Sequence, residues 1–372
     1  MVSLCIAGGA AAEPALAPAP AAAPAPSEPE LVAKEVAPPA FAWEPFGFLR
    51  MQYIAVQNDP NVEFIGRDDG FELQNARVGV RGDLQGLVRF VISLDGAVDE
   101  RAQNTPQGKL RVGLRDAYAD VWLGGDLAVR GGFFESWADP ETLVPETARE
   151  FVDRPIESRG MRSTEGWYTP PLPPGRSLGA ALRLDPAQAN RLGFELAVQN
   201  GADEFASNND NDKPAVSAAA LFRVADGGYV VAARRWNPST VGELPFRQDE
   251  TDLQGSFGAH VLAGPVSLGA AAVVQRTTFD STHGPVQNAY GAHAQALVEV
   301  PAAWPVWVGY RFGILDPSSL IVTDRVMEHT AGALLTVPRL RMRVQLQLTH
   351  VQEQAARALS NDRIQLAAEV AL

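Results

Sequence analysis

Apolar and polar residues alternate along most of the chain after residue 41, in short segments separated by Gly, Pro, Asn and Asp. A period of two predicts β-strands, because successive side chains of a strand point to opposite faces. Such a strand separates an apolar environment from an aqueous one. The clearest example is residues 341–349, with Met342, Val344, Leu346 and Leu348 on one face and Arg341, Arg343, Gln345, Gln347 and Thr349 on the other.

Sixteen segments of this kind can be recognised, and most are close to the length that a tilted strand needs to cross a bilayer. Because strand boundaries read from sequence shift by a few residues, counts of about 14 or 18 remain open, and the even number is firmer than its value. The candidate strands are residues 46–57, 71–83, 85–95, 113–124, 126–134, 176–184, 192–200, 215–224, 227–236, 252–263, 265–276, 289–299, 304–313, 328–337, 340–351 and 362–372.

The connections between these segments alternate in length, with seven short turns and eight long loops. A transmembrane barrel with an even number of strands and both termini in the periplasm has this arrangement. The long loops are expected at 58–70, 96–112, 135–175, 201–214, 237–251, 277–288, 314–327 and 352–361. The sequence therefore predicts an all-β, 16-stranded antiparallel transmembrane β-barrel over residues 41–372, with short periplasmic turns and long extracellular loops.

The third long loop, residues 135–175, is much longer than the others and rich in charged side chains. A loop of this length usually has a function or is disordered. In a 16-stranded barrel, which encloses an aqueous channel, we expect it to fold inward and narrow the lumen. The alternative is an external loop, because long loops also collect tolerated insertions.

The residues before the barrel have a different composition. Residues 1–12 are apolar and end in three alanines, which predicts the end of a secretory signal peptide whose basic start is missing. Residues 13–40 form an Ala/Pro-rich segment that we interpret as an extended periplasmic leader. A merely Ala-rich disordered terminus is the alternative. Cys5 is the only cysteine, so the barrel has neither a disulfide nor a cysteine metal site.

Composition excludes several function classes. The chain has no apolar run long enough for a membrane helix, and its mean hydropathy is −0.07. A formal charge of −13 argues against a nucleic-acid partner. The five histidines are far apart without metal-ligand spacing, and no catalytic motif is present, so we expect neither an enzyme nor a cofactor. A phospholipase with Ser and His on the barrel exterior stays open, because such residues meet only in three dimensions.

Five motifs follow one another along the chain: FELQNARVGVRG at 71–82, RDAYAD at 115–120, VRGGFFE at 129–135, EFVDR at 150–154, and VQNG at 198–201 with DNDKP at 210–214. Together they resemble the phosphate-selective porin O and P family. The resemblance covers about residues 71–214, and the rest of the chain matches in pattern only. It implies a homotrimeric 16-stranded outer-membrane porin of a Gram-negative bacterium, with a basic constriction that passes small anions.

Two features depart from this family. The chain has only three lysines, whereas phosphate-selective members line the lumen with many, and it ends in Leu372 instead of an aromatic residue. Arginine can replace lysine as a fixed positive charge and binds oxyanions through its planar fork. Strand parity and the motifs together give the expected pore-lining and constriction residues: Arg50, Arg77, Arg81, Arg115, Glu135, Arg149, Asp153, Arg154, Arg159, Arg311, Arg341 and Arg343.

Two functions remain open from sequence. The first is a pore for passive diffusion of small hydrophilic solutes, biased toward anions such as phosphate if the arginines dominate the lumen. A mixed-charge wall without selectivity is the alternative within this class. The second function is a structural or adhesive barrel in contact with outer-membrane lipid, which would not conduct.

Overall fold

The computed structural model describes residues 41–67, 69–97, 112–201, 212–224, 227–241, 247–280, 284–354 and 358–372. The predicted signal peptide and leader, and the first two residues of the DNDKP segment (210–211), lie outside these residues. The compact unit that is described begins near Pro39 and contains all of the strands.

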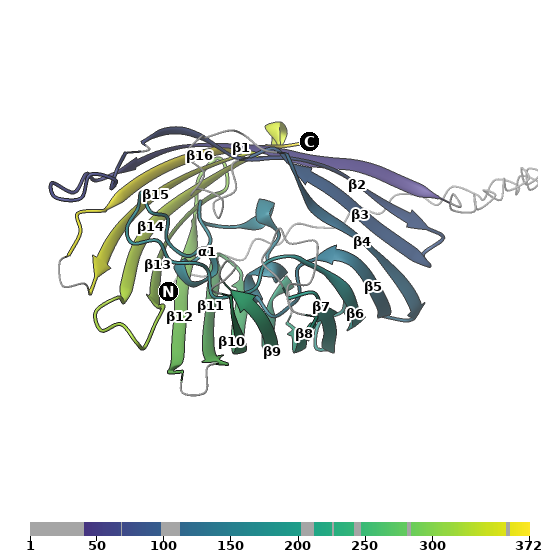
Figure 1. Cartoon of the computed structure of the whole chain (residues 1–372). Coiled ribbons are helices and arrows are strands. Elements are labelled where there is room, and N and C mark those ends of the chain that lie inside the picture. The colour runs from purple at the N-terminus through teal and green to yellow at the C-terminus, as the bar shows by residue number, and fades with distance from the viewer. Residues whose placement is uncertain are drawn as a thin grey trace, which may run out of the picture. The chain divides into compact units, whose positions relative to one another are not determined.

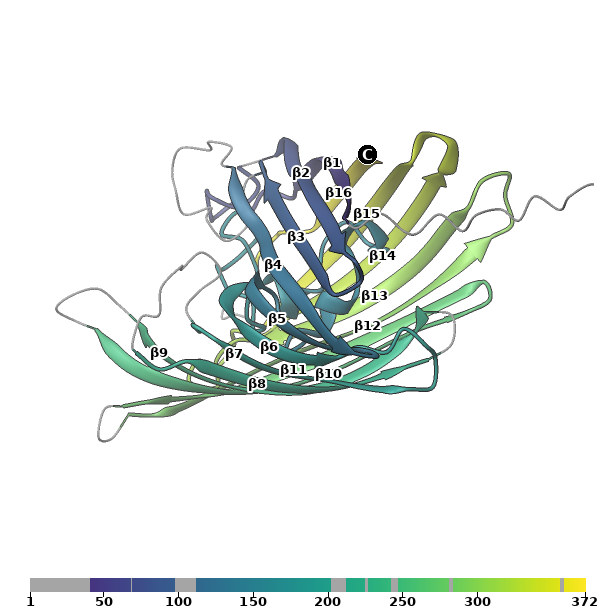
Figure 2. The ribbon, with the colours of Figure 1, turned by 90° about the vertical axis from the view of Figure 1, so that its right-hand side faces the viewer.

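Sixteen antiparallel strands close into one barrel in which each strand pairs with its neighbours in the chain and β1 pairs with β16 (Figures 1 and 2). The first eight strands are β1 (Ala42–Val56), β2 (Gly70–Leu84), β3 (Val88–Asp95), β4 (Gly113–Gly124), β5 (Leu127–Phe134), β6 (Ser177–Leu184), β7 (Leu192–Gln199) and β8 (Ala215–Arg223). The second eight are β9 (Tyr229–Val241), β10 (Gln248–Ala263), β11 (Val266–Phe279), β12 (Val286–Val300), β13 (Val306–Asp316), β14 (Val326–Val337), β15 (Met342–Glu353) and β16 (Arg363–Ala371). The predicted fold class and strand number are confirmed.

The connections differ from the sequence prediction in one respect. Strand β9 extends to Val241, and β10 already begins at Gln248, so the predicted loop 237–251 is much shorter. The predicted loop 277–288 is shortened in the same way between β11 and β12. The alternation of short and long connections is therefore less strict than predicted, because polar residues such as Asn237 and Asp252 continue the ladder as inward-facing strand positions.

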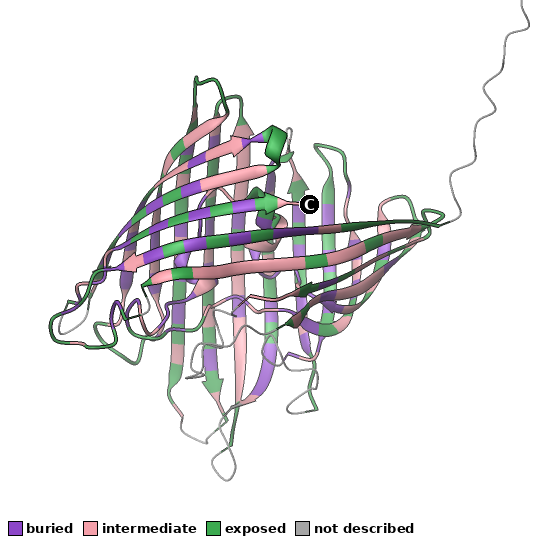
Figure 3. Ribbon diagram, turned by 90° about the horizontal axis from the view of Figure 1, so that it is seen from above, coloured by how far each residue is buried: buried purple, intermediate pink, exposed green. Residues whose placement is uncertain are grey.

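The barrel wall has polar side chains on its inner face and apolar side chains on its outer face, the reverse of a water-soluble protein. In β16 the side chains of Arg363, Gln365 and Glu369 are buried, whereas Ile364 and Leu366 are about half exposed. Figure 3 shows this alternation of buried and exposed positions along the strands. An apolar outer surface around a polar interior is what a bilayer outside and water inside require.

Short helical elements complete the fold. The segment between β5 and β6 contains η1 (Pro140–Leu143), η2 (Glu146–Ala148) and α1 (Ile156–Arg159), and η4 (Pro338–Leu340) lies between β14 and β15. No helix in the described ranges is long and apolar enough to cross a membrane. Figure 1 places α1 inside the ring of strands, so the segment between β5 and β6 occupies the lumen.

Candidate functional site

The segment 135–176, which we call the lumen loop, makes hydrogen bonds to opposite sides of the barrel. On one side, Arg50 of β1 donates to the carbonyl oxygen of Glu146 at 2.8 Å. On the other, Ser256 of β10 donates to the carbonyl oxygen of Ala138 at 2.7 Å. The loop therefore spans the lumen and does not lie against one part of the wall only.

Four arginines hold the middle of the lumen loop from the β1, β2, β4 and β15 side of the barrel, and we call this group the arginine side. Arg77 and Arg115 each donate to one carboxylate oxygen of Glu146 at 2.8 Å, in addition to the bond from Arg50. Arg343 donates to the carbonyl oxygens of residues 147 and 149. One buried carboxylate and several main-chain carbonyls are thus shared among permanently charged guanidinium groups.

Two β-bulges direct additional side chains to the lumen loop. The register shift in the β3–β4 pair leaves Arg115 as the extra residue, and the shift in the β1–β2 pair leaves Gln74. Arg115 reaches Glu146, and Gln74 lies 3.4 Å from a carboxylate oxygen of Asp153. Bulges commonly re-aim a side chain beside a functional site. Without these bulges, the strict alternation of a strand would turn either Arg115 or its neighbour in β4, and either Gln74 or its neighbour in β2, away from the loop.

A second charged network lies where the lumen loop leaves and re-enters the wall. Arg154 lies 3.2 Å from Glu135 and 3.3 Å from Asp139, and Arg176 lies 3.1 Å from Glu135. Burial opposes ionisation of Glu135, but Arg176 and Arg154 outweigh it and lower its pKa. For Asp139 burial is the larger effect and raises the pKa to about 7, although Arg154 opposes the shift. The two carboxyl groups therefore differ in how readily they lose their charge.

Histidines face the lumen loop from β10 and β12, and we call His260, His293 and Gln295 the histidine side. His293 Nδ1 lies 2.5 Å from Glu157 Oε1, and its Nε2 lies 3.7 Å from Glu141. His260 lies 3.7 Å from Glu150, and Gln295 donates to the same carboxylate at 2.7 Å. Here the loop supplies the carboxylates and the wall supplies titratable or neutral partners.

Glycines make room for the lumen loop along β10 to β14. A Cβ atom added at Gly258 would lie 2.4 Å from Pro140, and one at Gly291 would lie 2.4 Å from the Cβ of Glu157. A Cβ added at Gly332 would lie 2.7 Å from the ring of Phe151. These positions face inward, so the missing side chains form notches into which the loop packs.

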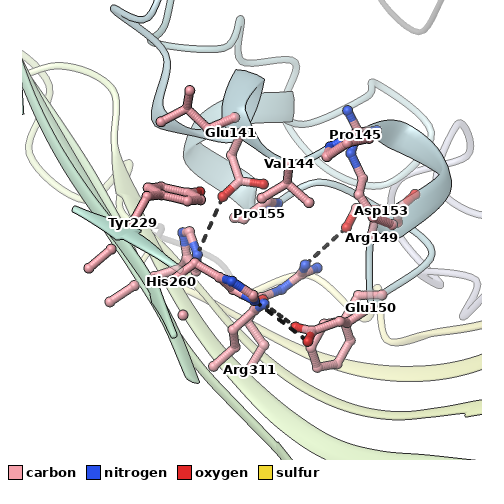
Figure 4. A pocket seen from close by; sticks show the side chains of 18 of the residues that line it. Glu141, Val144, Pro145, Arg149, Glu150, Asp153, Pro155, Tyr229, His260 and Arg311 are labelled. Atoms are coloured by element: carbon pink, nitrogen blue, oxygen red, sulfur yellow. Dashed lines mark hydrogen bonds and ion pairs between the residues drawn. The ribbon is translucent and has the colours of Figure 1, made fainter. Parts of the chain in front are cut away.

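A cavity of about 190 Å³ remains between the lumen loop and the wall formed by β9 to β13 (Figure 4). Its charged and titratable lining consists of Glu141, Arg149, Glu150, Asp153, Tyr229, His260, His293 and Arg311. Burial and the neighbouring Arg154 lower the pKa of Arg149 to about 9, which leaves it cationic at neutral pH. The cavity is large enough for a small ion with part of its water.

Most of the predicted pore-lining residues point into the barrel or lie in the lumen loop. Arg50, Arg77, Arg115, Arg311 and Arg343 face inward from the wall, and Glu135, Arg149, Asp153, Arg154 and Arg159 belong to the loop. Arg81 faces inward near the end of β2 but is more than half exposed and pairs with Glu44. Arg341 was expected in a strand and lies instead in the turn after η4, with an exposed side chain and a left-handed backbone at φ 47°.

Sequence reasoning missed several residues of the lumen. Glu146 receives more guanidinium groups than any expected residue, yet nothing in its sequence context distinguishes it from other loop glutamates. Arg183 and Arg363 could have been found, because both occupy the polar face of alternating strands and pair with Glu195 and Glu328. No group of three or more His, Cys, Asp or Glu side chains that could hold a metal occurs in the described ranges.

Comparison with known proteins supports the fold. No family model and no curated protein sequence matches the chain. Among solved structures, an anion-selective porin from Comamonas acidovorans is 13% identical, with 89% of this chain and 100% of that one covered and a TM-score of 0.62. The outer-membrane channel DcaP of Acinetobacter baumannii is 12% identical, with 90% and 98% covered and a TM-score of 0.62. OprB of Pseudomonas putida is 10% identical, with 89% and 94% covered and a TM-score of 0.58.

At these identities the likeness shows the fold, which is that of the outer-membrane porins. The apolar outer face of the barrel and this fold together support a place in the outer membrane of a Gram-negative bacterium. The narrower resemblance to the phosphate-selective porin O and P family stays a prediction.

Proposed function

We propose that the chain is an outer-membrane porin that allows passive diffusion of small hydrophilic solutes. The observation that carries this proposal is a polar, charged lumen that is partly filled by the chain's own loop, with a cavity left between the loop and the wall. Rings of fixed charge at a constriction govern which ions pass. A narrow passage of this kind excludes large and apolar solutes.

We also propose a bias toward anions. Around the arginine side and the Glu135 network, guanidinium groups outnumber carboxylates among the described residues. The cations are Arg50, Arg77, Arg115, Arg149, Arg154, Arg176 and Arg343, and the carboxylates are Asp116, Glu135, Asp139, Glu146 and Glu369. Arg311, beside the cavity, donates to main-chain carbonyls and packs on the Phe151 ring. No carboxylate of the described residues therefore forms an ion pair that cancels its charge.

The solutes that suit such a lumen are small anions, with phosphate as one member of the class. Planar guanidinium groups bind phosphate and carboxylate through two parallel hydrogen bonds. The family resemblance supports phosphate, and the scarcity of lysine argues for a broader preference. We further propose that the protein assembles as a homotrimer.

Recording from planar lipid bilayers tests both parts. We expect stepwise ohmic currents that close in groups of three, and a reversal potential in a KCl gradient that favours chloride. Insertion without current would contradict the pore, and a reversal potential that favours potassium would contradict the anion bias.

One observation favours the second candidate, a structural barrel. The lumen loop touches opposite walls, and the most exposed titratable side chain lining the remaining cavity, that of His260, is only 24% exposed. A loop that stayed fixed in this position and sealed the lumen would give a barrel that inserts without conducting. The same recordings separate the two candidates.

A further inference from the structure

Arg235 is a buried arginine of the lumen that lacks the partners its neighbours have. It faces inward from β9 and is 8% exposed. Its Nη2 donates to the side-chain oxygen of Asn237 at 3.3 Å, and its Nε has no hydrogen-bond partner in the part of the chain that the structure describes. Among the described residues, no carboxylate lies within ion-pair distance of its guanidinium group.

Two other inward-facing arginines of the wall are neutralised by carboxylates, and a third is bound by main-chain carbonyls. Arg183 pairs with Glu195 and Arg130 pairs with Asp120, while Arg311 is held by two main-chain carbonyls. A buried charge without a counter-charge is costly in free energy, and a structure retains it only when something compensates for it. Arg235 therefore points to a compensating group that is not part of the wall.

The side chains beside Arg235 are suited to an anion. The strand register places Ser217 of β8 and Gln254 of β10 directly opposite it. The hydroxyl of Ser217 is buried and has no hydrogen-bond partner in the described ranges, and Gln254 donates to the carbonyl oxygen of Leu172 at 3.3 Å. Asp252, a carboxylate that acts on the charge of Arg235 without forming an ion pair with it, accepts a hydrogen bond of 2.5 Å from Thr277. Within the described part of the chain, the Ser217 hydroxyl and Arg235 Nε thus remain donors without a partner, while Asp252 is already engaged by Thr277.

We propose that Arg235, Ser217 and Gln254 form a binding station for a small oxyanion, namely a phosphate or carboxylate group of a passing solute. The station is distinct from the cavity of Figure 4, whose lining does not include these residues. A guanidinium fork with a hydroxyl donor beside it matches the oxygens of such a group. This inference rests on the proposed anion-biased pore and identifies the chemistry that one part of the pore recognises.

The test compares Arg235→Gln with Arg234→Gln. Arg234 is the next residue of β9, and its exposed side chain points to the outer face of the barrel, so the two variants lose the same charge on opposite faces. The probe is inorganic phosphate at constant ionic strength, with two readouts: the thermal unfolding midpoint in detergent, and the reduction of single-channel chloride current. We expect phosphate to raise the midpoint and reduce the current in the unmodified protein and in Arg234→Gln.

In Arg235→Gln, the phosphate concentration that gives half of the thermal shift or half of the current reduction should rise at least ~10-fold. This is the change in affinity expected from the loss of one charge-assisted hydrogen bond. Without phosphate this variant should unfold at a higher temperature, because an uncompensated buried charge has been removed. Ser217→Ala keeps the charge of Arg235 and should weaken phosphate binding by a smaller factor. This variant tests the station if Arg235→Gln does not fold.

The possible results of this experiment distinguish failure of the oxyanion station from failure of the proposed pore function. An anion-biased current with a phosphate response that is the same in Arg235→Gln and Ser217→Ala as in the unmodified protein would overturn the station and leave the proposed function intact. Absence of current in every variant would overturn the proposed function, while a thermal shift by phosphate that is lost only in Arg235→Gln would still support the station. No thermal shift and no current reduction by phosphate in the unmodified protein would also overturn the station.

Discussion

The arginine side and the histidine side hold the same loop by different chemistry. On the arginine side the wall supplies permanent cations, and Arg77 and Arg115 converge on the single carboxylate of Glu146. On the histidine side the loop supplies Glu141, Glu150 and Glu157, and the wall supplies histidines and an amide. The wall of the histidine side is also notched by glycines, whereas that of the arginine side is filled by long side chains.

This difference indicates which attachment responds to conditions. The pKa of Glu146 lies well below its ordinary value, because Arg115, Arg149 and Arg77 outweigh the effect of burial. Arginine stays charged at all ordinary pH values, and histidine is the side chain whose charge changes between about pH 5 and 8. We therefore expect the arginine side to hold the loop through permanent charges at all ordinary pH values, whereas the wall of the histidine side offers no permanent charge.

The largest effect is expected from Glu146→Gln, which removes the carboxylate shared on the arginine side. Removing one partner of a buried ion pair costs ~3–5 kcal/mol, because the remaining buried charges lose part of their compensation. The loop should detach at its middle, so that single-channel conductance rises several-fold and anion selectivity increases. The control is Glu63→Gln, which breaks an exposed ion pair with Arg67. Conductance and urea stability equal to those of this control would show that the arginine side does not anchor the loop.

The next effect concerns the notches of the histidine side. Gly291→Val would force its side chain against Glu157 and the His293 contact beside it. Overpacking of this kind costs ~1–3 kcal/mol. We expect the loop to move away from β12, with higher conductance and little change in selectivity. Gly131→Val is the matched control, because nothing lies within 4 Å of a Cβ atom at that position. If both variants conduct alike, the loop does not depend on the glycine notch.

A smaller effect should appear as a pH dependence of stability. The pKa of Asp139 is raised from 3.8 to about 7, chiefly by burial. Between these two values the folded protein binds a proton that the unfolded chain does not, so stability falls as the pH rises through this window. We expect a thermal midpoint several degrees lower at pH 8 than at pH 5.5.

In Asp139→Asn, which resembles the protonated form, that difference should shrink. Asp126→Asn changes a more exposed carboxylate and should leave the difference unchanged. A midpoint that rises from pH 5.5 to pH 8 in the unmodified protein would reverse the sign and contradict the assignment.

The smallest effect is expected at the ends of the barrel. Arg81 pairs with Glu44, and both side chains are 59% exposed. Exposed ion pairs contribute ~0–1 kcal/mol, so Arg81→Gln should hardly alter stability and should shift the reversal potential only slightly. Arg341→Gln, in the turn after η4, should change neither. A large loss of selectivity in either variant would show that the constriction lies at the mouth of the barrel and not at the lumen loop.

Strand number, strand parity and the inward faces could be predicted because a barrel in a membrane imposes a period of two on every strand. The inward positions of Arg50, Arg311 and Arg343 follow from this rule alone. The lumen loop has no such period, and the partners of Glu146 come from strands far away in sequence. Its path therefore could not be read from local patterns.

The departures from prediction have local physical causes. The bulge at Arg115 breaks parity and brings an extra residue to the loop. Pro338 begins a 3-10 turn, since proline at the start of a helical turn loses no hydrogen bond, and this turn carries Arg341 out of the strand. Arg235 lies inside the predicted strand 227–236 but was missed, because it follows Arg234 directly and the preceding Val and Ala residues do not alternate with polar ones, so the inward face could not be read.

The pairing of β1 with β16 has a consequence for the order of assembly. Arg50 forms an ion pair with Glu369 across this seam and also donates to the carbonyl oxygen of Glu146. One side chain, that of Arg50, therefore links the first strand both to the last strand and to the lumen loop. Barrel closure and loop docking should be coupled steps of folding, each accelerating the other, so that a barrel with its loop outside would also be slow to seal its seam.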